Sequence, residues 1–231
     1  VLITPGAKQA LLYSYMTVLN PGDEAILLSP SWASYEPMIS IIGGVPVNVP
    51  VDRKNFHPDM DAIRSSITNR TRMIMVNSPC NPTGAVYTRE EIEEIVSIAI
   101  EHDLWIISDE IYSRLIWNGG EHVSPATIEG GKERTIVISG WSKTWAMTGM
   151  RVGFLAGPEQ AVRAAVKCQA NSASHIPTFM MEAARVALDC DDHVERFSDA
   201  YRQRRKLMVQ GLEDIPGLRI VNPEGAFYLF I

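Results

Sequence analysis

Short apolar runs of strand length alternate with longer amphipathic stretches along most of the sequence, and this alternation constrains the fold more than any other feature. It indicates strand–helix–strand units whose strands pair in parallel. Nearly every position within the short runs is apolar, which is typical of strands covered by helices on both faces. We therefore predict an α/β fold of three layers, α/β/α, with a mostly parallel sheet. The expected strands span residues 24–28, 45–49, 72–77, 104–108 and 135–139, and the expected helices span residues 7–19, 35–42, 59–67 and 88–102.

The C-terminal part of the sequence has a different pattern. From about Ala184 it becomes mainly helical, a long basic helix is expected over residues 198–212, and strand character returns in residues 218–231. We predict a large domain in residues 1–197, followed in residues 198–231 by a connecting helix and the start of a small α+β domain. Because the sequence begins without methionine and stops within an apolar run, we expect it to be a fragment whose small domain is truncated.

Charge and composition argue against several classes of protein. The sequence carries 27 acidic and 21 basic residues, a net charge of −6, whereas nucleic-acid binders normally have a basic surplus. No apolar run approaches the ~18 residues that a membrane span needs, and the first residues lack the pattern of a signal peptide. The three cysteines and five histidines are scattered without metal-ligand spacing. We expect no nucleic-acid partner, no membrane association, no metal site, and free thiols in a reducing cytoplasm.

Side chains suited to catalysis or ligand binding follow the carboxyl ends of the expected strands. An open α/β sheet binds its ligands at that edge. The side chains are Trp32 after residues 24–28, Asn81 after 72–77, Asp109 and Tyr112 after 104–108, and Lys143 after 135–139. We therefore expect an aromatic ring, an amide, a carboxylate, a phenol and an amine to meet there, beside the start of the first helix.

This set of side chains suits pyridoxal 5′-phosphate. The cofactor needs a lysine amine that forms an imine and a carboxylate that keeps its pyridine nitrogen protonated. A phenol or an amide can hold its ring oxygen, and a flat aromatic side chain can stack on its ring, which adds ~0.5–1.5 kcal/mol beyond area burial. Its phosphate is suited to the N–H groups at a helix start and to a bidentate cation, for which Arg151 is the candidate.

Four segments resemble the signature of the class I aminotransferases of fold type I. They are NPTG at residues 81–84, SDEIY at 108–112, SKTWAMTGMRVG at 142–153 and PEGAFY at 223–228. Their order and separation also fit, so the resemblance covers essentially the whole sequence and is greatest to the aspartate aminotransferase-like branch. It implies the large cofactor-binding domain of a pyridoxal-phosphate-dependent transferase.

The resemblance implies catalytic roles for three residues and binding roles for two more. Lys143 would form the Schiff base with the cofactor and move the proton during catalysis. Asp109 would pair with the pyridine nitrogen. Tyr112 and Asn81 would hydrogen-bond the ring oxygen, with Asn81 also near the substrate carboxylate, and Trp32 would stack on the ring. The peptide bond that follows Asn81 would be cis.

The phosphate of the cofactor would lie at the start of the first helix, closed by a cation. The residues implied there are Gly6, Ala7, Lys8 and Arg151. Lys8 is expected to contribute its backbone N–H rather than its side chain. The family often has a phosphate-binding serine three residues before the lysine, where this sequence has Gly140, and either Ser142 or Ser139 is a candidate to replace it.

The implied activity is that of an aminotransferase with ping-pong kinetics. It would move an amino group between an L-amino acid, aspartate-like or related, and a 2-oxo acid, and a homodimer is also implied. Three alternatives stay open: a carbon–sulfur β-lyase on the same scaffold, an aminotransferase-like effector domain of a transcription regulator, and an isolated domain that binds the cofactor at most. We expect the family's substrate-carboxylate arginine and N-terminal closing segment to lie outside these 231 residues.

Overall fold

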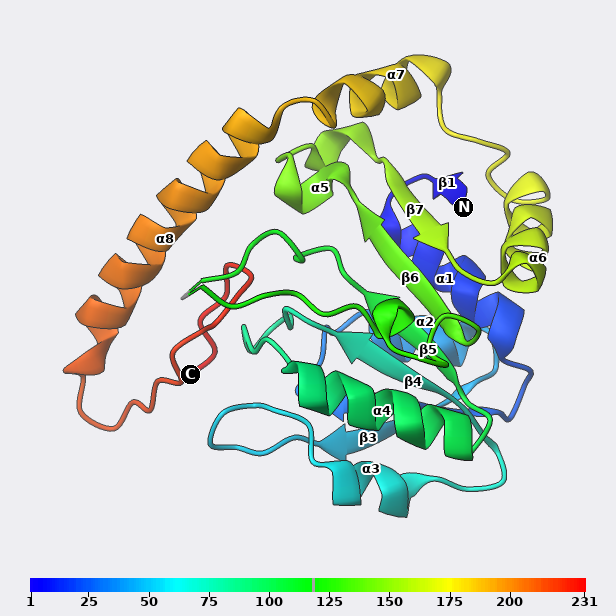
Figure 1. The fold of residues 1–231 in the computed structure, drawn as a ribbon, viewed down its shortest axis with the longest axis horizontal. Coiled ribbons are helices and arrows are strands. Elements are labelled where there is room, and N and C mark those ends of the chain that lie inside the picture. The colour runs from blue at the N-terminus through cyan, green and yellow to red at the C-terminus, as the bar shows by residue number, and fades with distance from the viewer. Residues whose placement is uncertain (118) are drawn as a thin grey trace.

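A seven-stranded sheet forms the centre of the molecule in the computed structural model, which describes residues 1–117 and 119–231 (Figure 1). Across the sheet the order is β1-β7-β6-β5-β4-β2-β3. Strands β2 to β6 pair in parallel, and β7 runs antiparallel to its neighbours β6 and β1. The predicted α/β fold with a mostly parallel sheet is therefore confirmed. The strands are β1 (Leu2–Thr4), β2 (Glu24–Ser29), β3 (Val45–Pro50), β4 (Thr71–Asn77), β5 (Trp105–Asp109), β6 (Thr135–Gly140) and β7 (Gly153–Ala156).

Helices cover both faces of this sheet and complete three layers (Figure 1). Successive strand residues point to opposite faces. Leu27 and Met75 therefore enter one core with α1, α2 and α6, whereas Ile26 and Ile74 enter the other core with α3 and α4. Burial on both faces explains why the strands are apolar at consecutive positions. The helices are α1 (Ala7–Val18), α2 (Tyr35–Ile41), α3 (Met60–Ser66), α4 (Arg89–Glu101) and α6 (Glu159–Ala170).

The remaining elements of the described chain are α-helices that follow β6 and two short 3-10 turns, one before β6 and one after it. α8 runs along the outside of the molecule before the chain returns toward the loop after β5 (Figure 1). The helix expected over residues 198–212 starts earlier than predicted, so it crosses the predicted domain boundary, and that division stays a prediction. No helix that the structure describes has both the length and the apolar character needed to cross a membrane. These elements are α5 (Trp141–Thr144), α7 (Thr178–Ala187), α8 (Asp191–Glu213) and single 3-10 turns at Pro125–Thr127 and Thr148–Met150.

The expectation of strand structure in residues 218–231 is wrong. Within the described chain this segment makes one isolated bridge, between Gly225 and Ile116, and is otherwise irregular. The N–H groups of Glu224 and Gly225 both donate to the carbonyl of Gly84, at 2.9 and 2.8 Å, so the segment bonds to a loop. A strand requires a partner that offers a ladder of N–H and C=O groups, and apolar composition alone does not supply one.

Candidate active site

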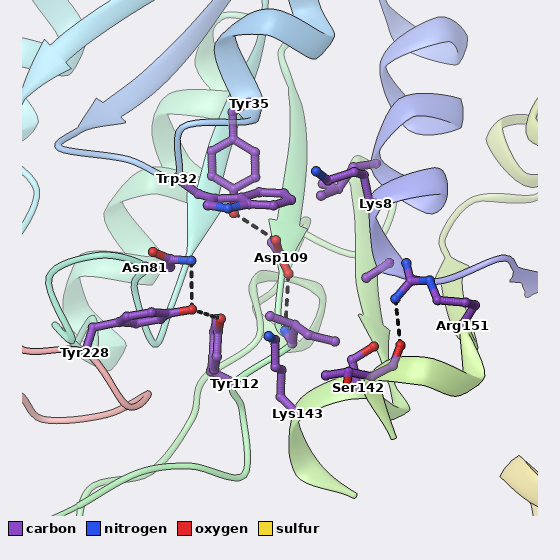
Figure 2. Close-up of a pocket in the computed structure, with 14 residues that line it drawn as sticks. Lys8, Trp32, Tyr35, Asn81, Asp109, Tyr112, Ser142, Lys143, Arg151 and Tyr228 are labelled. Carbon is purple, nitrogen blue, oxygen red and sulfur yellow. Dashed lines mark hydrogen bonds between the residues drawn. The ribbon is translucent and has the colours of Figure 1, made fainter. Parts of the chain in front are cut away.

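A cavity of about 350 Å³ lies at the carboxyl ends of β4, β5 and β6, beside the start of α1 (Figure 2). Parallel strands end at the same edge of the sheet, and this brings together side chains that are far apart in the sequence. Gly6 is the one predicted site residue that does not line it. The predicted residues that do are Ala7, Lys8, Trp32, Asn81, Asp109, Tyr112, Lys143 and Arg151. In residues 1–117 and 119–231 no three His, Cys, Asp or Glu side chains gather as metal ligands.

Asp109 is the last residue of β5 and lies buried at the floor of the cavity. The Tyr35 hydroxyl donates to its Oδ2 at 2.8 Å, and the Ile111 N–H donates to its Oδ1 at 3.2 Å (Figure 2). Burial raises the pKa of Asp109 from 3.8 to about 6, although these two hydrogen bonds oppose the rise. A buried carboxylate with this pKa is stabilised by a cation placed beside it, which suits a protonated ring nitrogen.

Lys143 lies in the short helix α5, directly after β6, with its amine in the cavity. Its Nζ is 5.8 Å from the ring centre of Tyr112 and 5.3 Å from that of Phe227. Partial burial lowers the pKa of Lys143, and the positive charge of Arg151 lowers it further, whereas Asp109 opposes the change. A lowered pKa leaves more of the amine neutral near pH 7, and the neutral amine is the nucleophile and the base.

Asn81 and Tyr112 meet at one point in the cavity, where both contact the hydroxyl of Tyr228 (Figure 2). The Asn81 side-chain amide donates to the Tyr228 oxygen at 3.1 Å, and the hydroxyls of Tyr112 and Tyr228 lie 2.5 Å apart. Burial raises the pKa of Tyr112 far above its ordinary value, so this phenol keeps its proton at neutral pH. The peptide bond from Asn81 to Pro82 is cis, as expected.

Lys8 contributes its side chain to the cavity, although the sequence indicated only its backbone N–H. Its Nζ lies 4.8 Å from the ring centre of Trp32 and donates to the Ser34 hydroxyl at 3.2 Å. Trp32 in turn makes an edge contact with Tyr35, with ring centres 5.3 Å apart. Lys8 therefore places a second cation in the cavity besides Arg151, and Trp32 supplies an aromatic wall.

Arg151 lies against the start of α1, at the corner where Gly6 precedes the helix. A Cβ added at Gly6 would lie 2.3 Å from Arg151 Nη2, so only glycine leaves room for the guanidinium there. A Cβ added at Gly153 of β7 would lie 2.3 Å from the backbone nitrogen of Ala7, so this glycine lets the strand approach the helix start. The first N–H groups of an α-helix have no partner within the helix. A helix start beside a guanidinium is a site for an anion.

Ser142 lines the cavity, whereas Ser139 does not. The Ser139 hydroxyl donates to the backbone carbonyl of Glu110 at 3.3 Å and is engaged away from the cavity. Gly140 cannot be replaced by serine without rearrangement, because an added Cβ would lie 2.7 Å from the carbonyl oxygen of Val152. Of the two candidates named from the sequence, Ser142 is therefore the one placed to contact a ligand.

Two tyrosines in this site were missed from the sequence. Tyr35 starts α2 and reads as an ordinary buried aromatic residue, yet it bonds Asp109, which is 74 residues away along the chain. Tyr228 lies in the PEGAFY segment, but its bond partner Tyr112 is 116 residues away. The sequence holds one signal for each. Tyr35 lies three residues after Trp32, and Tyr228 lies within the PEGAFY segment.

Comparison with known proteins identifies the family. The model of the aminotransferase class I and II family matches residues 1–231. The chain is 41% identical to an aspartate aminotransferase of Musicola paradisiaca and to an aspartate/prephenate aminotransferase of Thermus thermophilus, covering 100% of this chain and 58% and 60% of those proteins. A solved aromatic aminotransferase of Pyrococcus horikoshii superimposes with a TM-score of 0.95 at 40% identity, over 99% of this chain and 62% of that one. The chain thus spans about 60% of the length of the relatives it matches, and it belongs to the class I and II aminotransferase family.

Proposed function

We propose that this chain forms the cofactor-binding part of a pyridoxal-phosphate-dependent aminotransferase. The whole protein would transfer an amino group between an L-amino acid, aspartate or a related one, and a 2-oxo acid. One observation carries the proposal: the Lys143 amine and the Asp109 carboxyl line the same cavity, beside the anion site at the start of α1. The class I and II family, to which the chain belongs, supports it.

The donor set of the cavity fits pyridoxal phosphate. Asn81 and Tyr112 bring an amide N–H and a hydroxyl to one place in the cavity, and these are groups that hydrogen-bond a phenolic ring oxygen such as the cofactor's. Arg151 and the helix start form a cationic corner where Gly6, which has no Cβ, leaves room for the guanidinium, and a cationic corner suits a phosphate. Trp32, which forms an aromatic wall of the cavity, would stack on the pyridine ring.

The residues of the chain divide the chemical work between them. When bound, pyridoxal phosphate supplies an aldehyde that condenses with amines and a protonated ring that withdraws electrons. Asp109 would hold the proton on the ring nitrogen, because its buried carboxylate gains from a cationic partner. Lys143 would anchor the cofactor and, once displaced by the substrate amine, take the proton from the substrate Cα and give it back. Its lowered pKa supports both roles, since each requires a neutral amine.

The position of the Lys8 ammonium supports the proposal that the substrate is a dicarboxylic amino acid. Arg151 is committed to the anion corner, whereas Lys8 Nζ lies over Trp32 at another part of the cavity. A substrate such as aspartate carries a second carboxylate that can pair with this ammonium. The names of the relatives from Musicola paradisiaca and Thermus thermophilus point the same way.

The assembly and location of the whole protein are also proposals. Exposed apolar side chains on α7, among them Phe179 and Val186, support a homodimer, because an interface between two copies would remove them from water. The cysteines Cys80, Cys168 and Cys190 are all unpaired, which supports the reducing cytoplasm as the compartment.

An amino-exchange assay on the full-length protein tests the proposed function. Protein supplied with pyridoxal phosphate, aspartate and a 2-oxo acid should release the oxo acid of aspartate, and Lys143→Ala should abolish this exchange. Lys8→Ala should raise the KM for aspartate more than the KM for an uncharged amino acid. Release of pyruvate and ammonia from a β-substituted substrate, without amino exchange, would instead indicate the carbon–sulfur β-lyase.

A further inference from the structure

Tyr228 belongs to the C-terminal segment, yet its hydroxyl lies between two of the residues assigned to the cofactor ring. It is 3.1 Å from Asn81 Nδ2 and 2.5 Å from the Tyr112 hydroxyl (Figure 2). Its ring also makes an edge contact with the ring of Tyr112, with centres 5.6 Å apart. None of the roles derived above uses this hydroxyl.

The backbone around Tyr228 is tied to the two loops that carry its partners. Gly225 N–H donates to the carbonyl of Gly84, in the loop that follows β4 and carries Asn81, at 2.8 Å. Ala226 N–H donates to the carbonyl of Leu115, in the loop that follows Tyr112, also at 2.8 Å. A Cβ added at Gly225 would lie 2.6 Å from the Cβ of Pro79, so the segment packs closely on the first loop. Tyr228 is therefore held in register with both loops.

The chemistry of the groups fixes the direction of the bond from Asn81 and allows either direction between Tyr112 and Tyr228. An amide N–H can only donate, so the Tyr228 oxygen accepts from Asn81. The proton of Tyr228 is then free to donate to the Tyr112 oxygen. When Tyr112 accepts that bond, its own proton is free for a third oxygen in the cavity. A chain of hydroxyls that all donate in one direction is polarised, and its last donor is strengthened.

We propose that Tyr228 is a positioning residue for the cofactor: held by Asn81, it donates to Tyr112, so that Tyr112 presents its proton to the ring oxygen of pyridoxal phosphate. This inference rests on the proposed function, because it requires that cofactor. It extends the proposed function by giving the C-terminal segment, which packs on the loops after β4 and β5, a direct part in holding the ring.

Tyr228→Phe tests the proposal, because it keeps the ring and removes the hydroxyl. In the full-length protein loaded with pyridoxal phosphate, the pH midpoint of the cofactor's visible absorbance should rise by ~0.3–1 unit, since an ionised ring oxygen loses part of its stabilisation. The Kd of the cofactor should rise about threefold to tenfold, the range for one lost hydrogen bond. The other titratable or charged residues that line the cavity are Lys8, Tyr35, Asp109, Tyr112, Lys143 and Arg151, and none is substituted in this variant.

A double-mutant cycle separates a positioning role from simple packing. If Tyr228 acts through Tyr112, then Tyr228→Phe should cause no further shift of the midpoint in a Tyr112→Phe background. Tyr13→Phe is the matched control, because it removes a phenol that bonds Ser172 away from the cavity, and it should leave the midpoint unchanged.

Each outcome bears on one claim. An unshifted midpoint in Tyr228→Phe overturns the inference, as does a shift of equal size in the Tyr112→Phe background. Tighter cofactor binding in Tyr228→Phe also overturns it, because Tyr228 would then compete with the ring oxygen. A wild-type protein that binds no pyridoxal phosphate contradicts the proposed function itself.

Discussion

Replacing Gly6 with alanine perturbs the corner that we assign to the cofactor phosphate. Gly6 has φ 87° and ψ 162°, a backbone conformation that residues with a Cβ rarely adopt, and forcing it on alanine costs ~1–3 kcal/mol. The added Cβ would also lie 2.3 Å from Nη2 and 2.9 Å from Cζ of Arg151, so the guanidinium must leave. A charge-assisted hydrogen bond is worth ~1.5–3 kcal/mol, so we expect the Kd of pyridoxal phosphate to rise about 10- to 150-fold.

Fluorescence titration of the apo form of the full-length protein measures that Kd, and urea unfolding measures the free energy of unfolding. Gly149→Ala is the matched control, because no atom lies within 4 Å of its added Cβ. In an Arg151→Ala background, Gly6→Ala should weaken binding little further, because the group that it displaces is already gone. A Gly6→Ala protein that binds the cofactor with wild-type Kd would refute the assignment of this corner to the phosphate.

Three further predictions concern titrating groups. Because burial raises the pKa of Asp109 to about 6, wild-type affinity for pyridoxal phosphate should fall as the pH is lowered through about 6. Titrations of Asp109→Asn should lack this fall. An identical profile in both proteins would contradict the pairing of Asp109 with the ring nitrogen. Tyr35→Phe removes a hydrogen bond that lowers the pKa of Asp109, so the wild-type midpoint should move upward by ~1 unit; no movement counts against that bond. Glu224 and Glu91 raise the pKa of His57 from 6.5 to about 9, so its stabilising effect is complete below pH 6.5 and is lost as the pH rises through 9. His57→Gln should therefore lower the free energy of unfolding, measured with urea, by ~1–2 kcal/mol near pH 6 and by little above pH 9. The value near pH 6 is reduced because the Glu224 side chain is 44% exposed. Equal losses at both pH values would contradict this.

The central strands could be predicted because a strand that is buried on both faces appears in the sequence as a continuous run of apolar residues. Residues 25–28 of β2 and 73–76 of β4 are all apolar, because their side chains alternate between the two cores. The two antiparallel strands β1 and β7 were not predicted, because each is short and is defined by its pairing with neighbouring strands. The opposite error occurred in residues 218–231, where apolar composition suggested a strand, whereas among the described residues this segment forms one isolated bridge.

Some of the site residues could likewise be predicted from the sequence, and others could not. Lys143, Asp109 and Asn81 follow strand ends within short motifs, so the sequence brings them to one edge of the sheet before any contact is known. Tyr35 and Tyr228 contact residues that are 74 and 116 positions away in the sequence. The spacing of nearby residues does not predict contacts at such separations. The side chain of Lys8 was likewise missed, because its place on α1 is fixed by Trp32 and Ser34 on another segment.

Chemical trapping tests the central claim, that Lys143 is the amine that binds the cofactor. The full-length protein is loaded with pyridoxal phosphate and reduced with borohydride, and the modified peptide is then identified by mass spectrometry. We predict one cofactor per chain on Lys143, none in Lys143→Ala, and unchanged trapping in Lys8→Ala, which removes the other lysine of the cavity. Trapping at the same stoichiometry in Lys143→Ala, or on a different lysine of the wild-type protein, would contradict the claim.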